Sequence, residues 1–404
     1  MQVINEKEEQ NNDNLTSQQV IEEYLTVMRR EVNPSAEYLR VTKSVLSKIN
    51  VMTATQEDVA IFLDAVRKPE SDDPLHKWIG TYNFYVIILK RFFKWFTHDI
   101  HSLEGIKKIR RKETSIYKPT DLWTQEDDLL FLKYCPSKRD KCYHVISRDT
   151  SCRPSEILRL KVKDIVFKMV GDEKGSNKQY AECLVNGKTG SRQIPLINSL
   201  PYLKDYMDDH IADPNSYLIR SVKFSRLDSR SLGAIYRRYK KEYFPNLLKD
   251  PNISKEDKDA IAKLLTKPWN PYLRRHSALT EKSKILKEHI LRAHAGWSKR
   301  SDMPEKYLHY FGNESSESLL EAYGLKPSAE EFNKLAPVVC PNCSEGNQQQ
   351  SRFCAKCRMI LSYDLYLDTV QQKEEKTDRL TRIEENMNKL LQTLTKTGVL
   401  KPTT

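Results

Sequence analysis

Four short motifs supply side chains that together suit chemistry at a negatively charged phosphorus atom. In chain order they provide an arginine, a lysine, a second arginine and a tyrosine. The motifs are Arg153-Pro154-Ser155-Glu156, Gly187-Lys188-Thr189, Tyr272-Leu273-Arg274-Arg275-His276-Ser277-Ala278, and Gly296-Trp297 followed by Tyr307. Each motif is a weak signal by itself, but the ordered set of four is a strong one.

These residue types can cleave a phosphodiester without a catalytic metal ion. The planar guanidinium group of arginine is always charged and matches two phosphate oxygens at once, so two arginines can stabilise a pentacovalent transition state. A tyrosine hydroxyl has a pKa of about 10, so positive neighbours must help it to act as the nucleophile. A lysine can protonate the departing 5′ oxygen. The product would be a 3′-phosphotyrosine, which keeps the bond energy for rejoining without a nucleotide cofactor.

The ordered motifs resemble the catalytic domain of the tyrosine recombinases, the family of phage integrases and Xer-type proteins. The resemblance covers roughly residues 15–325 and implies site-specific cleavage and rejoining of DNA. It implies a catalytic set in which Glu156 orients the arginines and Tyr307 is the nucleophile. The residues that the resemblance assigns to catalysis are Arg153, Lys188, Tyr272, Arg275, Trp297, Tyr307 and Glu156.

The chain departs from the usual family pattern at two of these motifs. Tyr272 stands where the family usually has the histidine of a His-x-x-Arg-His sequence, so the identity of a general base is open. Arg274 competes with Arg275 for the catalytic role, and the match of Arg275 with the following residues favours Arg275. Trp297 replaces a histidine, as in some family members, and its indole N–H can donate to a phosphate oxygen.

The nucleophile and the lysine each have a competing interpretation. Tyr307 follows Trp297 with one residue more than the commonest family spacing, so Tyr310 and the more distant Tyr323 are rival nucleophiles. Lys188 lies in a glycine-bounded turn, which resembles the lysine hairpin of the family. The same Gly-Lys-Thr sequence is found in ATP-binding loops, but the upstream glycine that such loops require is missing here.

Charge and composition favour an anionic partner and a reducing compartment. The 404 residues carry a formal net charge of +12, which suits double-stranded DNA. No leader sequence and no apolar run long enough for a membrane span is apparent. Eight cysteines are few for a disulfide scaffold in a chain of this length. The sequence therefore predicts a cytoplasmic, nucleoid-associated protein.

Hydrophobic periodicity predicts an α+β protein that is mainly helical and has several domains. A helical SAM-like domain, similar to the DNA core-binding domain of recombinases, is followed by a basic linker and a mixed α/β catalytic domain. The predicted parts are a disordered tail (1–14), the core-binding domain (15–104), the linker (105–119), the catalytic domain (120–327), a zinc ribbon (336–362) and a helical tail (363–398).

Two CxxC pairs separated by ten residues predict a structural zinc site. The four thiolates are Cys340, Cys343, Cys354 and Cys357. Four cysteine ligands leave no open coordination position, so the metal would hold the ribbon together and take no part in catalysis. Together with the tyrosine and tryptophan replacements, the ribbon makes the chain look more like archaeal members of the family than bacterial ones.

The C-terminal segment resembles a short coiled coil. Its apolar residues alternate spacings of three and four, at Leu380, Ile383, Met387, Leu390 and Leu394. Packing of this helix on its own chain is the alternative. Recombination joins two DNA duplexes, each bound by two protomers, so a homotetramer on paired sites is expected. Leu319, Leu320 and Tyr323 form a second candidate contact.

Two other functions remain open at this stage. A type IB topoisomerase-like enzyme would use the same chemistry but relax DNA as a monomer. A DNA-binding protein of the same fold could lack catalysis.

Overall fold

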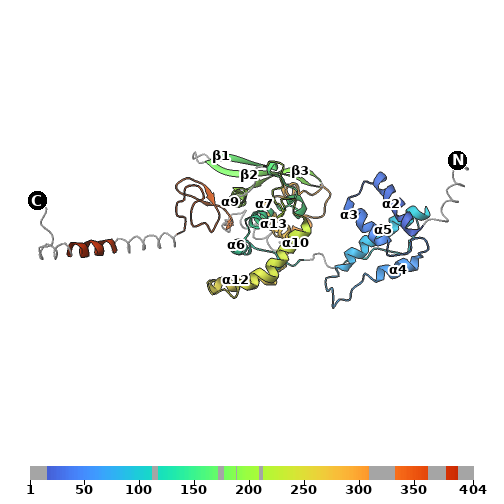
Figure 1. Ribbon diagram of the computed structural model, residues 1–404. Helices are drawn as coiled ribbons and strands as arrows, with labels where there is room; N and C mark the ends of the chain where they lie inside the picture. The colour runs from blue at the N-terminus through green and yellow to red at the C-terminus, as the bar shows by residue number, and fades with distance from the viewer. Residues whose placement is uncertain are drawn as a thin grey trace, which may run out of the picture. The chain divides into compact units, whose positions relative to one another are not determined.

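The computed structural model divides into two compact units, residues 1–116 and 117–404. The structure describes residues 16–111, 117–171, 177–187, 189–208, 213–308, 333–362 and 379–389. Figure 1 shows a helical first unit and a second unit that combines helices with a β-sheet. Among the described residues, no helix has both the length and the apolar character that crossing a membrane requires.

In its described residues, 16–111, the first unit is a bundle of four helices around one apolar core. These helices are α2 (Ser17–Glu31), α3 (Ala36–Leu46), α4 (Gln56–Asp64) and α5 (Trp78–Thr97). A capping box fixes the N-terminus of α4, because Thr55 and Asp58 cap it reciprocally. The aromatic residues of α5 lie largely inside the unit, where Phe92 is fully buried. The aromatic helix is therefore mostly core.

Part of the predicted linker packs on this first unit. Ile106 is buried in the core of the helical bundle. Asn83 binds the backbone of Ile109 twice, through its amide nitrogen and its carbonyl oxygen, each at 2.8 Å. The chain is thus held against α5 as far as Ile109.

The second unit contains more numerous and shorter elements. Its helices are η1 (Pro119–Asp121), α6 (Gln125–Tyr134), α7 (Lys138–Thr150), α8 (Pro154–Ile157), η2 (Val162–Asp164), α9 (Leu200–Asp208), α10 (Ser229–Arg238), the π-helix η3 (Tyr239–Tyr243), α11 (Phe244–Leu247), α12 (Lys255–Thr266), α13 (Pro271–Ile285), α14 (Glu288–Ala295) and α15 (Glu305–Leu308). Its strands are β1 (Ile165–Gly171), β2 (Asn177–Gly187) and β3 (Gly190–Leu196), followed by β4 (Val338–Val339) and β5 (Gly346–Asn347).

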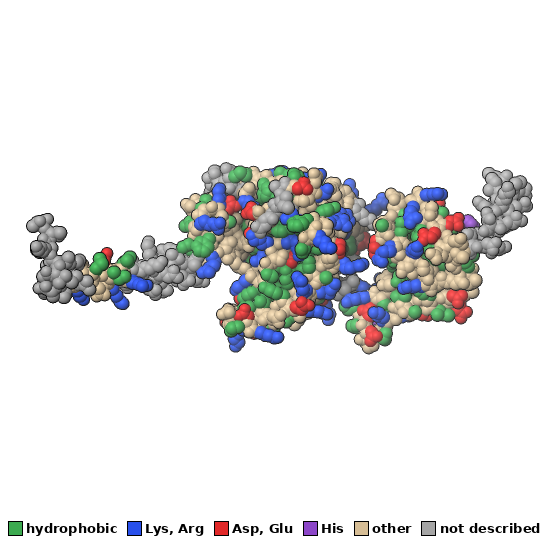
Figure 2. All heavy atoms as spheres, viewed as in Figure 1, with side chains coloured by type: hydrophobic (Ala, Val, Ile, Leu, Met, Phe, Trp, Pro, Cys, Tyr) green, Lys and Arg blue, Asp and Glu red, His purple; other side chains and the backbone are tan. Residues whose placement is uncertain are grey.

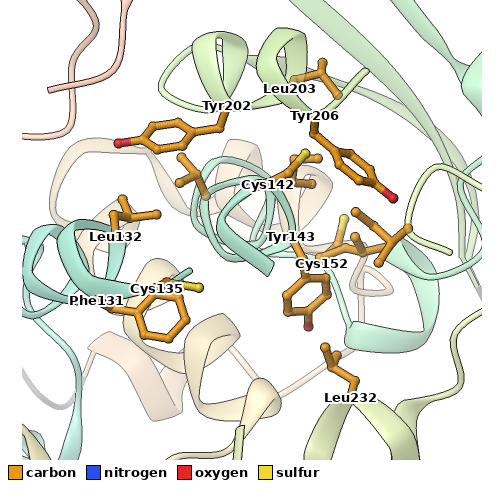
Figure 3. Close-up of a cluster of buried hydrophobic side chains, with 14 of the residues drawn as sticks. Phe131, Leu132, Cys135, Cys142, Tyr143, Cys152, Tyr202, Leu203, Tyr206 and Leu232 are labelled. Atoms are coloured by element: carbon orange, nitrogen blue, oxygen red, sulfur yellow. The ribbon is translucent and has the colours of Figure 1, made fainter. Parts of the chain in front are cut away.

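Helix α7 is the centre of this unit. It contacts α8, α9, α13 and β3, and every residue from Cys142 to Thr150 is buried. Figure 3 shows Cys142 and Tyr143 of α7 among side chains of α9 and α10. A fully buried helix of this kind fixes the positions of the elements around it.

The strands β1, β2 and β3 form one antiparallel sheet in chain order. Gly187 pairs with Gly190 where β2 meets β3. One face is apolar and buried through Ala181, Cys183 and Ile194, as alternation along a half-buried strand requires. Strands, which a mixed α/β domain requires, are thus present in the second unit.

The second pair of strands belongs to the small module that contains the four cysteines. Val338 pairs with Asn347, and Val339 pairs with Gly346. The module contacts α9, because Lys204 forms an ion pair with Glu345 and Gln348 donates to Asp205 over 3.1 Å. Gln350 also donates to the carbonyl of Leu129 in α6 over 3.2 Å. The position of the module on the second unit therefore depends on polar contacts with two helices.

Candidate active site

The N-terminus of α8 positions the first arginine. Arg153 is the residue before Pro154, which starts the helix, and its backbone N–H donates to Glu156 over 3.1 Å. The Arg153 side chain forms an ion pair with the same carboxylate, Nη1 to Oε1, at 2.9 Å. It remains partly exposed, whereas the Glu156 carboxylate is buried. Glu156 thus fixes both the backbone and the guanidinium group of Arg153.

Arg192 of β3 completes the contacts of Glu156. Its Nη2 donates to the second carboxylate oxygen at 2.9 Å. Burial by itself raises the pKa of Glu156, but the hydrogen bonds from Arg192 and Arg153 outweigh it and hold the pKa below its ordinary value. Glu156 therefore stays ionised and links α8 to the sheet.

Arg192 also connects the β2–β3 hairpin to the end of α14. Its Nε donates to the carbonyl of His294 at 3.0 Å, and Thr189 donates to the carbonyl of Gly296 at 3.0 Å. A Cβ on Gly296 would lie 2.7 Å from Arg192 Nη1, and one on Gly187 would lie 2.8 Å from it. Both glycines therefore leave the space that the guanidinium group occupies. Lys188, the predicted general acid of this hairpin, lies outside the described residues.

Helix α13 carries the second arginine and its neighbours. Asn270 caps the helix by accepting from the backbone of Tyr272 at 2.9 Å, and Pro271 is its first residue. Tyr272 is partly exposed. Burial by itself lowers the pKa of Arg153, but the interactions with Glu156 and with the Tyr272 side chain outweigh it and raise the pKa. Tyr272, the first residue of the motif that contains Arg275, thus lies beside Arg153.

Arg275 is buried and held by backbone carbonyls. Its Nη1 donates to Ser151 at 2.7 Å and its Nη2 to Ala295 at 2.9 Å. Burial, followed by the charge of Arg153, lowers the pKa of Arg275, while Tyr272 and Tyr307 raise it. These four side chains therefore act on one another electrostatically. Guanidinium stays charged in proteins and has five donors, so Arg275 keeps donors for a phosphate.

Arg274 points into the core, away from this group. It is 1% exposed, forms an ion pair with Asp128, and lies over the Trp123 ring at 4.8 Å. His144 contacts the same carboxylate through Nε2 at 3.0 Å. These contacts occupy Arg274 in a buried charge cluster and leave Arg275 beside the other predicted site residues.

Trp297 lies between Arg275 and Tyr307. Gly296 ends α14 in the left-handed conformation, with φ of 65°, and Trp297 N–H then donates to Arg292 at 3.0 Å. The Arg275 guanidinium lies 5.9 Å from the Trp297 ring centre. The buried indole Nε1 has no hydrogen-bond partner among the described residues. This N–H is therefore able to donate to an oxygen atom.

Tyr307 is 2% exposed and belongs to the short helix α15. Its ring stacks on Trp297 at 5.4 Å. Its hydroxyl lies 2.9 Å from Nδ1 of His276, one turn after Tyr272 on α13. Sequence reasoning did not assign a role to His276; the signal available was its position four residues after the missing histidine, on the same helix face. The rivals Tyr310 and Tyr323 lie outside the described residues.

The structure therefore brings Arg153, Glu156, Tyr272, Arg275, Trp297 and Tyr307 into one group. A pocket of 510 Å³ opens beside it, lined by Arg153, Tyr272, Arg230 and Arg237 among others. Basic side chains at the wall of a pocket suit an anionic ligand.

The four cysteines lie together in the C-terminal module. Their sulfur atoms are all within 4.8 Å of one another, with Cys340 and Cys357 at 3.5 Å and Cys343 and Cys354 at 3.6 Å. A tetrahedral zinc site with Zn–S bonds of about 2.3 Å places sulfur atoms about 3.8 Å apart. The donor set and its spacing fit zinc, and the separations are far longer than a disulfide bond.

No protein-family model matches the chain. No curated protein matches it.

Three solved structures illustrate what the chain is similar to. The Tn1549 transposon integrase in complex with transposon right end DNA is 14% identical over 77% of this chain and 100% of that chain, with a TM-score of 0.48. A lambda integrase dimer bound to a COC′ core site is 13% identical over 72% of this chain and 97% of that chain, with a TM-score of 0.47. The XerH site-specific recombinase bound to its palindromic difH substrate is 16% identical over 77% of this chain and 86% of that chain, with a TM-score of 0.48. All three are integrases or recombinases by name.

Proposed function

We propose that this chain is a site-specific tyrosine recombinase that cleaves and rejoins DNA strands through a 3′-phosphotyrosine. One observation carries the proposal: residues from α8, α13 and the segment 297–307, far apart in the sequence, form one group of two arginines, an indole donor and a tyrosine. This combination matches the needs of phosphodiester cleavage without a catalytic metal.

Each member has a role in the proposed reaction. Arg153 and Arg275 bind the two non-bridging oxygens of the scissile phosphate, and Trp297 donates to one of them. Tyr307 attacks phosphorus, and Lys188 protonates the departing 5′ oxygen. Glu156 does not touch the phosphate: it holds Arg153 in place through the 2.9 Å ion pair.

Tyr272 helps to bind the phosphate in this proposal. A phenol can donate a hydrogen bond but carries no positive charge, so it replaces only the donor function of a histidine. Its place beside Arg153 and at the wall of the 510 Å³ pocket puts its hydroxyl within the basic part of the site.

The first unit has its own surface for the DNA backbone. A groove of 720 Å³ is lined by cations from α5 and from the segment that follows it, namely Lys90, Arg91, Lys94, Lys107 and Lys108. Lysine and arginine side chains are also spread over the visible face of this unit (Figure 2). Each phosphate contact of this kind would release a counterion, so binding should weaken steeply with salt.

The C-terminal module is proposed to hold one structural zinc ion through Cys340, Cys343, Cys354 and Cys357. With so small a core, the module depends on the metal for its folding. The zinc supplies no chemistry to the cleavage step, because all four of its ligand positions are taken by sulfur.

The assembly on DNA is proposed to be a tetramer on paired sites. In the described part of the tail, residues 379–389, the apolar side chains of Leu380, Ile383 and Met387 are exposed, as a coiled-coil contact between chains would require. The other candidate residues of the tail, Leu390 and Leu394, and the stripe of Leu319, Leu320 and Tyr323 lie outside the described residues. Such a complex would function on the chromosome, in the cytoplasm.

The decisive experiment traps the covalent intermediate. A DNA substrate with a nick beside the cleavage point loses the 5′ fragment after cleavage, so the adduct accumulates. Wild-type protein should form the adduct and Tyr307→Phe should not, although both should bind the DNA equally. Tyr310→Phe is the matched control and should keep the adduct.

Three results would redirect the proposal. No adduct from wild-type protein on its own target DNA would favour an inert DNA-binding protein. Loss of the adduct in Tyr310→Phe alone would move the nucleophile to Tyr310. Efficient relaxation of supercoils by monomers, without strand exchange between paired sites, would favour a topoisomerase-like enzyme.

A further inference from the structure

We propose that His276 is the general base that removes the proton from Tyr307, in compensation for the histidine that Tyr272 replaces. The inference rests on the proposed function, since it concerns the activation of the same nucleophile. It adds a catalytic residue that the four sequence motifs do not require.

The geometry places His276 directly on the reacting oxygen. Its Nδ1 lies 2.9 Å from the Tyr307 hydroxyl, within the range for direct proton transfer. The two rings stack at 5.7 Å with an angle of 25° between their planes. Because Tyr307 is 2% exposed, bulk water has little access to take the proton instead.

Aromatic neighbours fix the imidazole ring in this position. Tyr117 lies 5.2 Å from the His276 ring and Tyr272 lies 5.3 Å from it. Tyr307, the hydrogen-bond partner of His276, is itself stacked on Trp297, with the two ring centres 5.4 Å apart. A ring confined in this way needs little reorganisation when the proton moves.

The other described side chains of the group are poorer bases. Arg153 and Arg275 stay protonated in proteins, and Tyr272 carries the same kind of hydroxyl as the nucleophile, so it has no advantage as a base. His294 is directed elsewhere, with Nε2 3.3 Å from the Ser151 hydroxyl. Among the described side chains, the one that contacts the Tyr307 hydroxyl through a ring nitrogen able to accept a proton is His276.

The helix explains how one residue can substitute for another. Positions 272 and 276 are four residues apart on α13, so they occupy one face of the helix in successive turns. A histidine at 276 can therefore reach the region that a histidine at 272 would serve. Tyr272 is left beside Arg153, where a donor is useful and a base is not.

The proposed step balances as follows. As a lone pair of the Tyr307 oxygen bonds to phosphorus, its O–H bond breaks and the proton moves to Nδ1 of His276. The P–O5′ bond breaks, its electron pair stays on O5′, and the general acid, proposed to be Lys188, protonates that oxygen. In rejoining, the imidazolium returns its proton to the tyrosine oxygen as the 5′-hydroxyl attacks phosphorus.

A sulfur leaving group separates the base from the acid. In a nicked substrate with sulfur at the bridging 5′ position, the thiolate leaves without a proton, so the acid becomes dispensable while the base does not. Full-length wild-type protein, His276→Ala and Lys188→Ala are tested for adduct formation on oxygen and sulfur substrates. His289→Ala, an exposed histidine of α14, is the matched control.

We expect His276→Ala to slow adduct formation by about 10²–10⁴-fold on both substrates, with DNA binding unchanged and with partial rescue by added imidazole. Lys188→Ala should be slow on the oxygen substrate and recover on the sulfur substrate. His289→Ala should behave as wild type. Because His276 is half-buried, His276→Gln, which can accept a hydrogen bond but cannot hold the proton, checks that the loss does not arise from misfolding.

Three outcomes would overturn the role of His276. Adduct formation by His276→Ala within about tenfold of wild type would exclude the base, since general bases contribute more than that. Recovery of His276→Ala on the sulfur substrate would make the residue an acid, and full activity of His276→Gln would make its role structural. A wild-type chain that forms no adduct on either substrate would instead refute the proposed function itself.

Discussion

Arg274 and Arg275 are adjacent on α13, yet their replacement by alanine should affect two different properties of the protein. Arg274 contacts Asp128 and Trp123 inside the second unit, whereas Arg275 lies beside Tyr307 and Trp297. We expect Arg274→Ala to lower the free energy of unfolding and Arg275→Ala to lower the rate of DNA cleavage. The pair therefore tests the assignment of the second catalytic arginine.

The magnitude for Arg274 follows from its buried partner. Arg274 and Asp128 are each 1% exposed, and removing one member of a buried ion pair costs about 3–5 kcal/mol because the other charge remains. Arg148, with Nε at 3.3 Å from Asp128, offsets part of this cost. The free energy of unfolding of the second unit should therefore fall by about 3 kcal/mol.

For Arg275→Ala, we expect a small loss of stability and a large loss of cleavage rate. Its loss removes two hydrogen bonds to backbone carbonyls, which contribute about 0.5–1.5 kcal/mol each. The cleavage rate should fall by about 10²–10³-fold, the effect of losing one donor to a developing oxyanion. At a temperature where both variants are folded, Arg274→Ala should still form the adduct at a rate close to wild type.

The acid sensitivity of the second unit gives an independent check on Arg274. Burial alone raises the pKa of Asp128, but Arg274 and Arg148 outweigh it and lower the pKa to about 2. A depressed carboxyl pKa stabilises the fold above the unfolded pKa of about 4, and this contribution is lost as pH falls towards 2. Arg274→Ala should reduce that dependence on pH.

Calorimetry of the full-length protein can measure these effects, with the transition of the first unit as an internal control. Asp128→Asn combined with Arg274→Ala should recover part of the lost stability, because no unpaired charge is left. The assignment would be refuted if Arg274→Ala were as stable as wild type and unable to cleave DNA, or if Arg275→Ala cleaved DNA normally.

Three further predictions concern separate parts of the site and the C-terminal module. Arg153→Ala should slow adduct formation by about 10²–10³-fold and weaken DNA binding much less, as rates and mobility shifts would show; an unchanged rate would remove Arg153 from the site. Metal analysis should find one zinc ion per chain, absent after Cys354→Ser with Cys357→Ser, and chelation should leave cleavage intact; a zinc-free wild type would contradict the metal site. Gly296→Ala should destabilise the protein by about 1–2 kcal/mol, because its φ is 65°, and slow cleavage; normal melting and normal rates would show that the loop adapts freely.

Local signals in the sequence predict that a helix or strand forms better than they predict the residue at which it ends. The Thr55–Asp58 capping box marked the start of α4, and alternation marked the three strands. Periodicity alone would continue the helix of Glu156 as far as Leu160, but α8 ends at Ile157. Its end is set by Lys161–Asp164, where Lys161 pairs with Tyr217, a contact between distant segments that local periodicity does not contain.

In the site too, contacts between sequence neighbours can be predicted, whereas contacts between distant residues cannot. The contact of Arg153 with Glu156 could be expected from a spacing of three on a helix. The contact of His276 with Tyr307 joins residues 31 positions apart and depends on how α15 packs on α13. The direction of Arg274 likewise follows from its partner Asp128, which no motif includes.

Arg192 has a consequence for how this sequence can diverge. Its guanidinium group occupies the space that side chains at Gly187 and Gly296 would need, and it also binds Glu156. A side chain at either glycine would therefore force the Arg192 guanidinium group to shift, and shortening Arg192 first would leave Glu156 without one of its partners. Related sequences should therefore keep Gly187, Arg192 and Gly296 together or change them together, because all three depend on the packing of one guanidinium group.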